Sequence, residues 1–142
     1  MSDVVSAVLA AAAAENAAVY GYSVAGARLA TNRDKNAARA AYDAHRAQVQ
    51  TLTQWLASLA TAPVPPAPVY RLPGPVADNA TARALLAAIE ESTAAAYADV
   101  VAVATAELQH DAALYLQAAA IREAQWRTTP VPFPGLVGRL PG

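Results

Sequence analysis

The chain has 142 residues, which is enough for one domain with a sizeable buried core. Hydrophobic residues make up 56% of it and charged residues only 15%, and the formal net charge is −1. This balance argues against a nucleic-acid-binding protein, which requires a clustered basic face. The absence of cysteine excludes disulfides, thiolate metal sites and cysteine nucleophiles.

The first residues match neither a membrane span nor a signal peptide. The apolar run 7–14 is shorter than the roughly 20 residues that a spanning helix needs, and Glu15 and Asn16 close it. No Lys or Arg precedes this run, so the basic region of a signal peptide is missing. We therefore expect a cytoplasmic protein that binds neither membranes nor nucleic acid.

Alanine, the best helix former, dominates the chain, and sustained β-type alternation is absent. The pattern predicts four helices, over residues 3–30, 33–60, 79–106 and 111–127. Ser2 is the expected N-cap of the first helix, and Asp78 or Asn79 that of the third. The proline-rich stretch 61–76 cannot be helical, and the tail 128–142, with four prolines and three glycines, is expected to be extended.

The connections between the expected helices differ in length, and this constrains the topology. Tight turns make the first and second helices, and the third and fourth, antiparallel pairs. The central connection of roughly 16 residues reaches about 50 Å in polyproline conformation, whereas a helix of about 28 residues is about 42 Å long. The sequence therefore favours an all-α four-helix bundle with a long Pro-rich crossover between the second and third helices. A simple up-down-up-down bundle stays open as the alternative.

Three ionisable residues, Glu15, His45 and Glu90, each fall in the apolar stripe of a different helix near its middle. In the crossover topology all three lie about 17–23 Å from the same end of the bundle, so they share one level. Three interpretations stay open: a mononuclear Fe or Mn site, exposure to solvent through a different helix rotation, or a structural polar network. The last would also include Tyr22, Tyr42 and Tyr97.

An inward Glu on the first helix, His on the second and Glu on the third resembles part of the carboxylate site of ferritin-like proteins. More narrowly, the chain resembles an actinobacterial family of ferritin-like domains that has no assigned function. This resemblance implies a ferritin-like four-helix bundle over nearly the whole chain, and it implies no activity. The stretches that carry it are 15–22 (Glu-Asn-Ala-Ala-Val-Tyr-Gly-Tyr), 44–46 (Ala-His-Arg), 63–70 (Pro-Val-Pro-Pro-Ala-Pro-Val-Tyr), 122–127 (Arg-Glu-Ala-Gln-Trp-Arg) and 133–136 (Phe-Pro-Gly-Leu).

The chain departs from a complete ferritin-like site, which has Glu-x-x-His on both its second and fourth helices. Tyr42 stands where the glutamate of the second helix would be. In the fourth helix the expected inward polar residue is Gln117, a weak ligand for iron. Two-metal oxidation chemistry is therefore not expected. The apolar stripe predicted for this helix is Ala113, Leu114, Gln117, Ala120, Ile121 and Ala124.

Other motifs do not add a catalytic site. Glu107-Leu-Gln-His110 has the letters of Glu-x-x-His, but it falls at the expected break near residues 109–111, about 20 Å along the bundle from Glu15, where we expect a solvated turn. No Ser-His-acid set can be placed, and Gly-x-Ser-x-Gly and phosphate-cradling glycine loops are absent. Gly21 and Gly26 are expected to mark a close helix crossing.

The sequence thus favours a non-catalytic, structural or interaction module with an incomplete metal site. The alternative is a protein that binds Fe or Mn through Glu15, His45 and Glu90 and has weak redox or storage activity. The apolar tail segment 130–137 is expected to pack on its own bundle or on a second subunit, which favours a homodimer.

Overall fold

The computed structural model of the protein describes residues 2–128, which form four α-helices and one 3₁₀ turn and contain no strand. The all-helical fold with four helices predicted from the sequence is confirmed. Except for Thr128, the expected extended tail lies outside the described residues. The elements are α1 (Asp3–Ala25), η1 (Gly26–Arg28), α2 (Asn32–Ser58), α3 (Asn79–Val103) and α4 (Ala106–Arg127).

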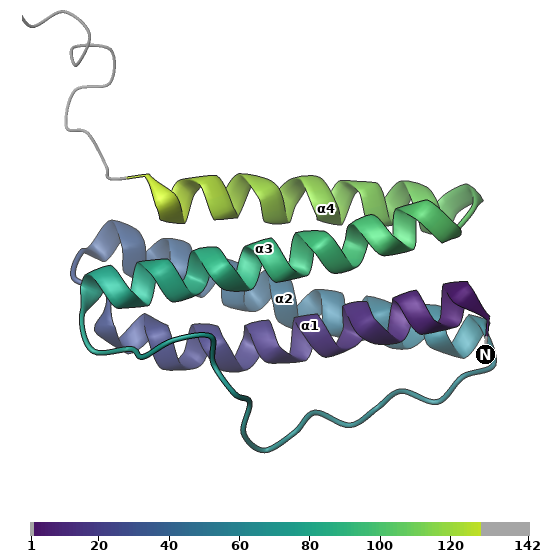
Figure 1. Cartoon of the computed structure of the whole chain (residues 1–142), viewed down its shortest axis with the longest axis horizontal. Coiled ribbons are helices and arrows are strands. Elements are labelled where there is room, and N and C mark those ends of the chain that lie inside the picture. Colours follow the sequence, from purple (N-terminus) through teal and green to yellow (C-terminus); the bar gives the residue numbers. More distant parts are fainter. Residues whose placement is uncertain (1, 129–142) are drawn as a thin grey trace, which may run out of the picture.

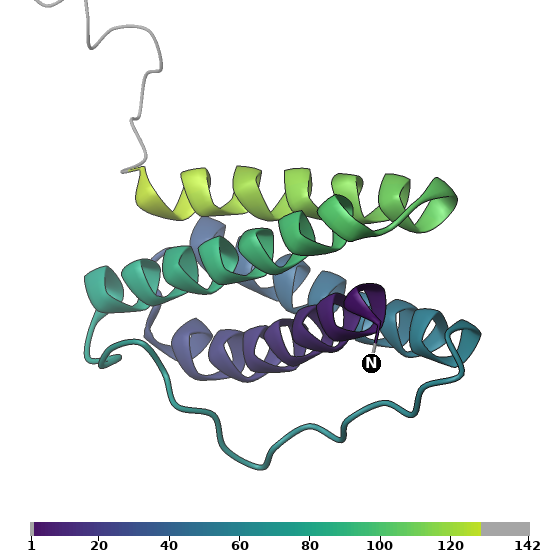
Figure 2. The same cartoon turned by 45° about the vertical axis from the view of Figure 1, so that its right-hand side comes forward.

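The four helices lie roughly along one axis, with α1 and α4 running in one direction and α2 and α3 in the other (Figure 1). α3 packs against both α1 and α4, and α1 also packs against α2. Residues 59–78 leave α2 at one end, pass along the outside of α1 and reach α3 at the opposite end (Figure 2). As a result, α2 and α3 begin at the same end of the molecule.

Side-chain caps fix where three of the helices begin. The hydroxyl of Ser2 accepts a hydrogen bond from the backbone of α1, and that of Thr31 accepts one from the amide of Asp34 at 3.1 Å. Asp78 and Thr81 form a reciprocal capping box at the start of α3. The N-caps predicted at Ser2 and Asp78 are therefore confirmed, because a short oxygen-bearing side chain satisfies amides that have no partner within the helix.

Both α1 and α2 end earlier than their composition predicted. α1 was expected to reach residue 30, but it ends at Ala25 and tightens into the turn η1, after which Leu29 is extended and buried. α2 ends at Ser58 because Ala60 adopts a left-handed conformation with φ 52°. The amide of Thr61 then bonds the carbonyl of Leu56 at 2.8 Å, which closes the helix in a Schellman arrangement.

The break between α3 and α4 lies earlier than predicted, so the break expected near residues 109–111 is wrong. α3 ends at Val103 rather than at 106, and α4 begins at Ala106 rather than at 111, with Thr105 extended between them. The side chain of Gln109 donates to the carbonyl of Val101 at 3.0 Å and so caps the end of α3. Glu107 and His110 consequently lie on the first turns of α4, where both are exposed.

The core is divided into two apolar clusters with a polar layer between them. One cluster includes Ala25, Leu86 and Trp126, and the other includes Val8, Leu56 and Val100. Alanine contributes many of the buried positions in both clusters, which allows close helix packing but buries little side-chain area per residue. The polar residues of the intervening layer are themselves buried; they are Glu15, His45, Gln48, Glu90 and Thr93.

Gly21 marks the close approach of α1 and α3, as predicted. A Cβ atom at this position would lie 2.1 Å from Cδ1 of Ile89, so a methyl group has no room unless that side chain moves. The same prediction is wrong for Gly26, because a Cβ atom there would meet nothing within 4 Å. The crossing therefore depends on one glycine rather than on two.

The rotation of α4 differs most from the prediction. Its buried residues are Ala112, Ala119 and Trp126, whereas Leu114 is 50% exposed and Ile121 54% exposed. The predicted stripe placed the large aliphatic side chains inside, but small alanines face α3 because the two helices pack closely there. In such an alanine-rich helix, side-chain size does not identify the buried face.

One segment of the described chain, Asp3–Arg28, is long and apolar enough to cross a membrane by length and composition alone. In the folded chain this segment packs a stripe that includes the fully buried Glu15 against α2 and α3. The expected absence of a membrane partner stays a prediction.

Candidate functional site

His45 occupies the centre of the polar layer and bridges two carboxylates. Its Nδ1 lies 2.5 Å from Oε2 of Glu15 on α1, and its Nε2 lies 2.8 Å from Oε1 of Glu90 on α3. All three side chains are fully buried. The three residues selected from the sequence therefore meet in one place, and the interpretation in which they face solvent is wrong.

The geometry favours a protonated imidazole at His45. Burial by itself lowers the pKa of this group, but hydrogen bonds and charge interactions with Glu15 and Glu90 outweigh burial and raise the pKa to about 9. At neutral pH both ring nitrogens then carry protons and donate to the two carboxylates. A neutral imidazole could donate to only one of them.

Two tyrosine hydroxyls donate hydrogen bonds to the carboxylates, each to the glutamate of the other helix. The hydroxyl of Tyr22 on α1 donates to Oε1 of Glu90 at 2.6 Å, and that of Tyr97 on α3 donates to Oε1 of Glu15 at 2.5 Å. Each tyrosine follows the glutamate of its own helix by seven residues. Because α1 and α3 run in opposite directions (Figure 1), this equal spacing carries each hydroxyl to the glutamate of the other helix. Desolvation by burial, reinforced by the neighbouring carboxylate, raises the pKa of both phenols, so they remain protonated donors.

Three further side chains belong to the network and were missed from the sequence. Gln48 on α2 donates from Nε2 to Oε1 of Glu15 at 2.8 Å, and Arg122 on α4 donates from Nε to Oε1 of Glu90 at 2.8 Å. Trp126 donates from Nε1 to the hydroxyl of Tyr22 at 2.8 Å. Their spacings could have suggested them, because Gln48 follows His45 by three residues and Trp126 follows Arg122 by four, so each pair shares a helix face.

Two residues expected inside the site lie elsewhere. Tyr42 is only half-buried and makes no hydrogen bond in the network; its ring lies under the guanidinium of Arg46 at 5.7 Å. Gln117 is exposed on the outer side of α4, so it is not an inward ligand. Arg122 takes the place expected for Gln117, because the rotation of α4 turns it toward Glu90.

The charges of the network balance. Glu15 and Glu90 contribute two negative charges, and His45 and Arg122 contribute two positive ones, all within hydrogen-bonding distance. Burial works to raise the pKa of Glu90, but the hydrogen bond and charge of His45, followed by the charge of Arg122, outweigh it and hold the pKa below its ordinary value. A buried charge is tolerated when it is paired and hydrogen-bonded in this way.

Two buried polar atoms of the described residues have no hydrogen-bond partner: Oε2 of Glu90 and Nη2 of Arg122. The two side chains already form an ion pair, in which Nε of Arg122 donates to Oε1 of Glu90. The same pair therefore contains one buried acceptor and one buried donor that have no hydrogen-bond partner. Oε2 of Glu90 is thereby the one oxygen of the two carboxylates to which no donor of residues 2–128 is bonded.

The donor set does not fit a resident divalent metal ion in this arrangement. Both nitrogens of His45 face carboxylates as proton donors, and protonated imidazole has no lone pair for a metal. Arg122 places a fixed positive charge next to Glu90. A divalent ion would add two further positive charges to four side chains whose charges already sum to zero. Within residues 2–128, no three acidic, histidine or cysteine side chains are arranged to hold a metal ion.

One protein-family profile matches most of the chain. The sequence profile described as "Domain of unknown function (DUF4439)" matches residues 7–138. The chain belongs to this family. The match begins in the first half of α1 and extends past the end of α4, so it covers the whole polar network of the DUF4439 domain.

A solved structure, described as that of a conserved hypothetical protein, Rv2844, from Mycobacterium tuberculosis, is similar to this DUF4439 chain. The two share 27% sequence identity with a TM-score of 0.84, over 87% of this chain and 94% of the mycobacterial one. None of the curated proteins matches the chain. The similarity indicates a common fold, and no activity follows from either description.

Proposed function

We propose that this DUF4439 chain is a non-catalytic ferritin-like module with a structural or interaction role, in which a neutral ion-pair network takes the place of a metal centre. The observation that carries the proposal is the position of Arg122. Its guanidinium lies 2.8 Å from Glu90 and comes from α4, the helix whose Glu-x-x-His would complete a ferritin-like site.

The ferritin-like origin is supported by the arrangement of the helices and of the polar residues. The glutamates of α1 and α3 and the histidine of α2 meet at one level, and the segment between α2 and α3 runs the length of the bundle (Figure 1). The family resemblance of the sequence, with its actinobacterial distribution, agrees with this interpretation. The substitutions that would remove metal binding are Tyr42, which stays outside the site, and Arg122, which enters it.

A structural role follows from the location of the network. It joins α1, α2, α3 and α4 through side chains from every helix, between two apolar clusters that both contain several alanines. Small alanine side chains specify helix register poorly, whereas a buried set of donors and acceptors is satisfied in only one register. We infer that the network fixes how the four helices align.

Metal titration tests the proposal against its alternative, a protein that binds Fe or Mn through Glu15, His45 and Glu90. The full chain is purified, its metal content is measured, and the apo form is titrated with Fe(II) and Mn(II) by calorimetry near neutral pH. We expect no stoichiometric metal in the purified chain and no binding tighter than about 1 mM, a free-energy limit of about 4 kcal/mol.

Two glutamate variants make the result specific. Glu15→Gln removes one carboxylate of the network, and Glu91→Gln removes an exposed carboxylate that is adjacent to Glu90 in the sequence. Metal binding near one equivalent that is lost in Glu15→Gln and retained in Glu91→Gln would overturn the proposal. Absence of binding in the wild-type chain supports it whether or not either variant folds.

The partners and location inferred from the sequence remain proposals. We propose a cytoplasmic homodimer without bound nucleic acid or membrane. Sedimentation velocity of the full chain over a concentration series tests the dimer, and a single species of monomer mass at all concentrations would contradict it.

A further inference from the structure

A groove along α1 and α2, on the surface outside the buried network, has the features of a ligand site. One part has a volume of about 450 Å³ and is lined by Ser23, Lys35, Arg39 and Tyr42, among others. A second part, also of about 450 Å³, lies under the segment between α2 and α3. Ser23 and Tyr42 line both parts, so the two parts are adjacent.

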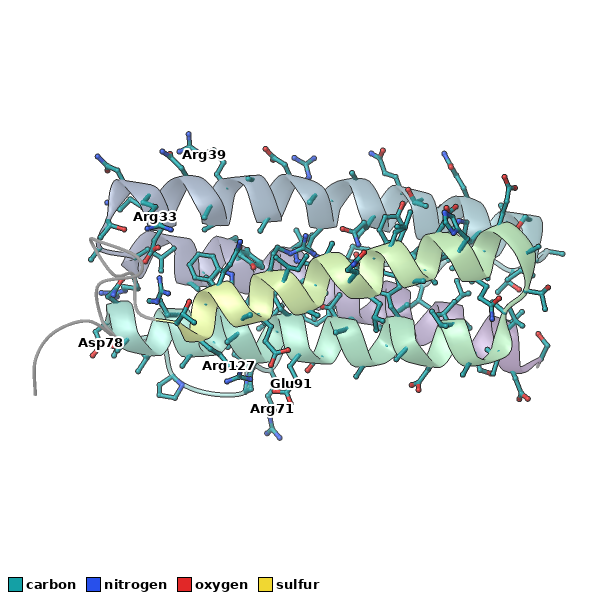
Figure 3. The ribbon with its side chains drawn as sticks, turned by 90° about the horizontal axis from the view of Figure 1, so that it is seen from above. Arg33, Arg39, Arg71, Asp78, Glu91 and Arg127 are labelled. Atoms are coloured by element: carbon teal, nitrogen blue, oxygen red, sulfur yellow. The ribbon has the colours of Figure 1, made fainter. Side chains whose placement is uncertain are left out.

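The floor of the groove carries a stripe of cations on α2. Lys35, Arg39, Tyr42 and Arg46 follow each other at spacings of four, three and four residues, which places them on one face of the helix. The three cationic side chains are exposed, and Arg39 projects outward from α2 near the end of the bundle where Arg33 also lies (Figure 3).

These cations have no carboxylate partner among residues 2–128, which is also true of Arg28, Arg33 and Arg71. Arg83, Arg122 and Arg127 each form ion pairs, whereas no ion pair among residues 2–128 includes Lys35 or Arg39. Arg46 likewise pairs with no carboxylate and rests on the ring of Tyr42 instead. The two acids of α2 do not pair with these cations either, because Asp34 pairs with Arg83 and Asp43 forms no ion pair among the described residues. Like charges on adjacent turns repel one another, and a bound anion would relieve that repulsion.

The other part of the groove is aromatic and is bordered on one side by the connecting segment. Tyr20 of α1 and Tyr70 of that segment face each other with ring centroids 5.7 Å apart and planes tilted by 49°. The hydroxyl of Tyr70 accepts a hydrogen bond from the amide of Ala67 at 2.9 Å, which holds this ring in place. Together with Pro66 and Tyr42, these side chains offer flat apolar surfaces to a planar ligand.

We propose that the groove binds a nucleotide, with its phosphates on Lys35 and Arg39 and its base against Tyr42 and Tyr70. Lys35 and Tyr42 lie about 10 Å apart along the helix axis, so the anionic and aromatic parts of one nucleoside diphosphate reach both. Arg46 lies beside the aromatic part, where a guanidinium stacks on planar rings. Tyr22 of the ion-pair network also lines the cationic part, but none of the residues assigned to the ligand belongs to that network.

Calorimetric titration of the full chain with ADP, GDP, UDP, adenosine and inorganic phosphate tests the site. We expect at least one of the three nucleotides to bind more tightly than about 1 mM, and adenosine and phosphate to bind at least tenfold more weakly than that nucleotide, since each keeps only part of the contacts. Failure of ADP, GDP and UDP to bind at that level overturns the proposal. Phosphate that binds as tightly as the best nucleotide overturns it as well.

Charge-matched variants separate the groove from general attraction to a basic surface. Lys35→Ala with Arg39→Ala removes both groove cations and should weaken nucleotide binding at least tenfold. Arg28→Ala with Arg33→Ala removes the same charge from exposed residues that do not line the groove and should change binding less than about twofold, the scale expected for screened surface charges that do not contact the ligand. Equal losses in the two double variants overturn the proposal.

A single variant of an aromatic residue tests the proposed position of the base. Tyr70→Ala should weaken nucleotide binding at least tenfold and leave the weaker binding of inorganic phosphate unchanged, because the ring contacts the base alone. All substituted residues are exposed or half-buried, so each variant is expected to keep the helical circular-dichroism spectrum and the unfolding midpoint of the wild type. Unchanged nucleotide binding in Tyr70→Ala contradicts the proposed base position.

Discussion

The raised pKa of His45 makes the stability of the protein depend on pH in a predictable direction. In the unfolded chain this histidine titrates near 6.5, and in the folded chain it titrates at about 9. A group whose pKa is higher in the folded state stabilises that state fully below the unfolded value, and the contribution is lost as pH rises through the folded value. Between pH 6.5 and 9 the folded chain therefore holds one proton more than the unfolded chain.

The size of the effect follows from the two pKa values. The free energy of unfolding should fall by about 1.4 kcal/mol for each pH unit across this interval. Over the whole interval the loss is about 3 kcal/mol, which is a large part of the stability of an ordinary domain. The buried tyrosines affect stability only at higher pH, because their pKa values are raised above the ordinary value of 10.0. Carboxylate titration acts only at acid pH, where the lowered pKa of Glu90 makes stability fall as pH decreases.

Urea unfolding followed by circular dichroism at steps between pH 6 and 9.5 measures this slope. His45→Gln removes the titrating group, so the variant should be less stable at pH 6.5 and nearly independent of pH up to 9. The chain has only one other histidine, the exposed His110, so His110→Gln is a matched control that should keep the wild-type slope. The two histidines also give a simple NMR spectrum, in which the ring signals of His45 should titrate near 9.

Two results would refute this account. A wild-type stability that stays constant between pH 6.5 and 9 would show that His45 is not held as an imidazolium. A slope that survives in His45→Gln would assign the pH dependence to another group. Either result would also remove the charge balance that supports the proposal of a network without a metal ion.

Three further predictions concern packing and ion pairs, each measured as a change in the free energy of unfolding by urea. Gly21→Ala should destabilise the chain by about 1–3 kcal/mol by overpacking the α1–α3 crossing. Gly26→Ala should stabilise it by about 0.4–1 kcal/mol, because the added methyl group has no atom within 4 Å. Effects of the same sign in both variants would contradict the crossing at Gly21. Ala60→Gly should stabilise it by about 1 kcal/mol by relieving the left-handed backbone at the end of α2, and a loss of stability would contradict that geometry. Arg122→Met should cost about 2–4 kcal/mol because it leaves Glu90 with one cation fewer, while Arg127→Met, whose ion pairs are exposed, should cost less than about 1 kcal/mol; equal costs would place Arg122 outside the network.

The sequence identifies the network's central residues because charge in an apolar stripe is unusual. Glu15, His45 and Glu90 each interrupt a row of small apolar side chains, and burying such groups is tolerable only when they meet partners. Their helices and their common level follow from helix rise and from the length of the central connection. Tyr22 and Tyr97 follow from the same face analysis, because each lies two turns after a glutamate.

The contribution of α4 could not be predicted in the same way. The rule that large apolar residues face inward selected Leu114 and Ile121, and both are exposed. Two hydrogen bonds orient this helix. Arg122 provides a second cation for Glu90, and Trp126 donates to the hydroxyl of Tyr22. These partners are in place only after the other helices are assembled. The sequence of α4 therefore shows that Arg122 and Trp126 share a face, but not that this face is the buried one. The break before α4 was missed for a related reason, since Gln109 caps α3 through a side chain eight residues away from the carbonyl that it binds.

Under the proposed function, the charge balance explains how a ferritin-like bundle keeps its core carboxylates without a metal. Two buried glutamates require two positive charges nearby, and a divalent ion supplies them in a metal-binding bundle. Here the imidazolium of His45 and the guanidinium of Arg122 supply the same total from the protein itself. Replacing both Glu15 and Glu90 by glutamine should therefore lower the pKa of His45 below 6.5, because burial would then act on it without a compensating carboxylate. If the NMR titration of this double variant still places His45 near 9, the carboxylates are not what holds its proton, and the proposed replacement of the metal by protein charges fails.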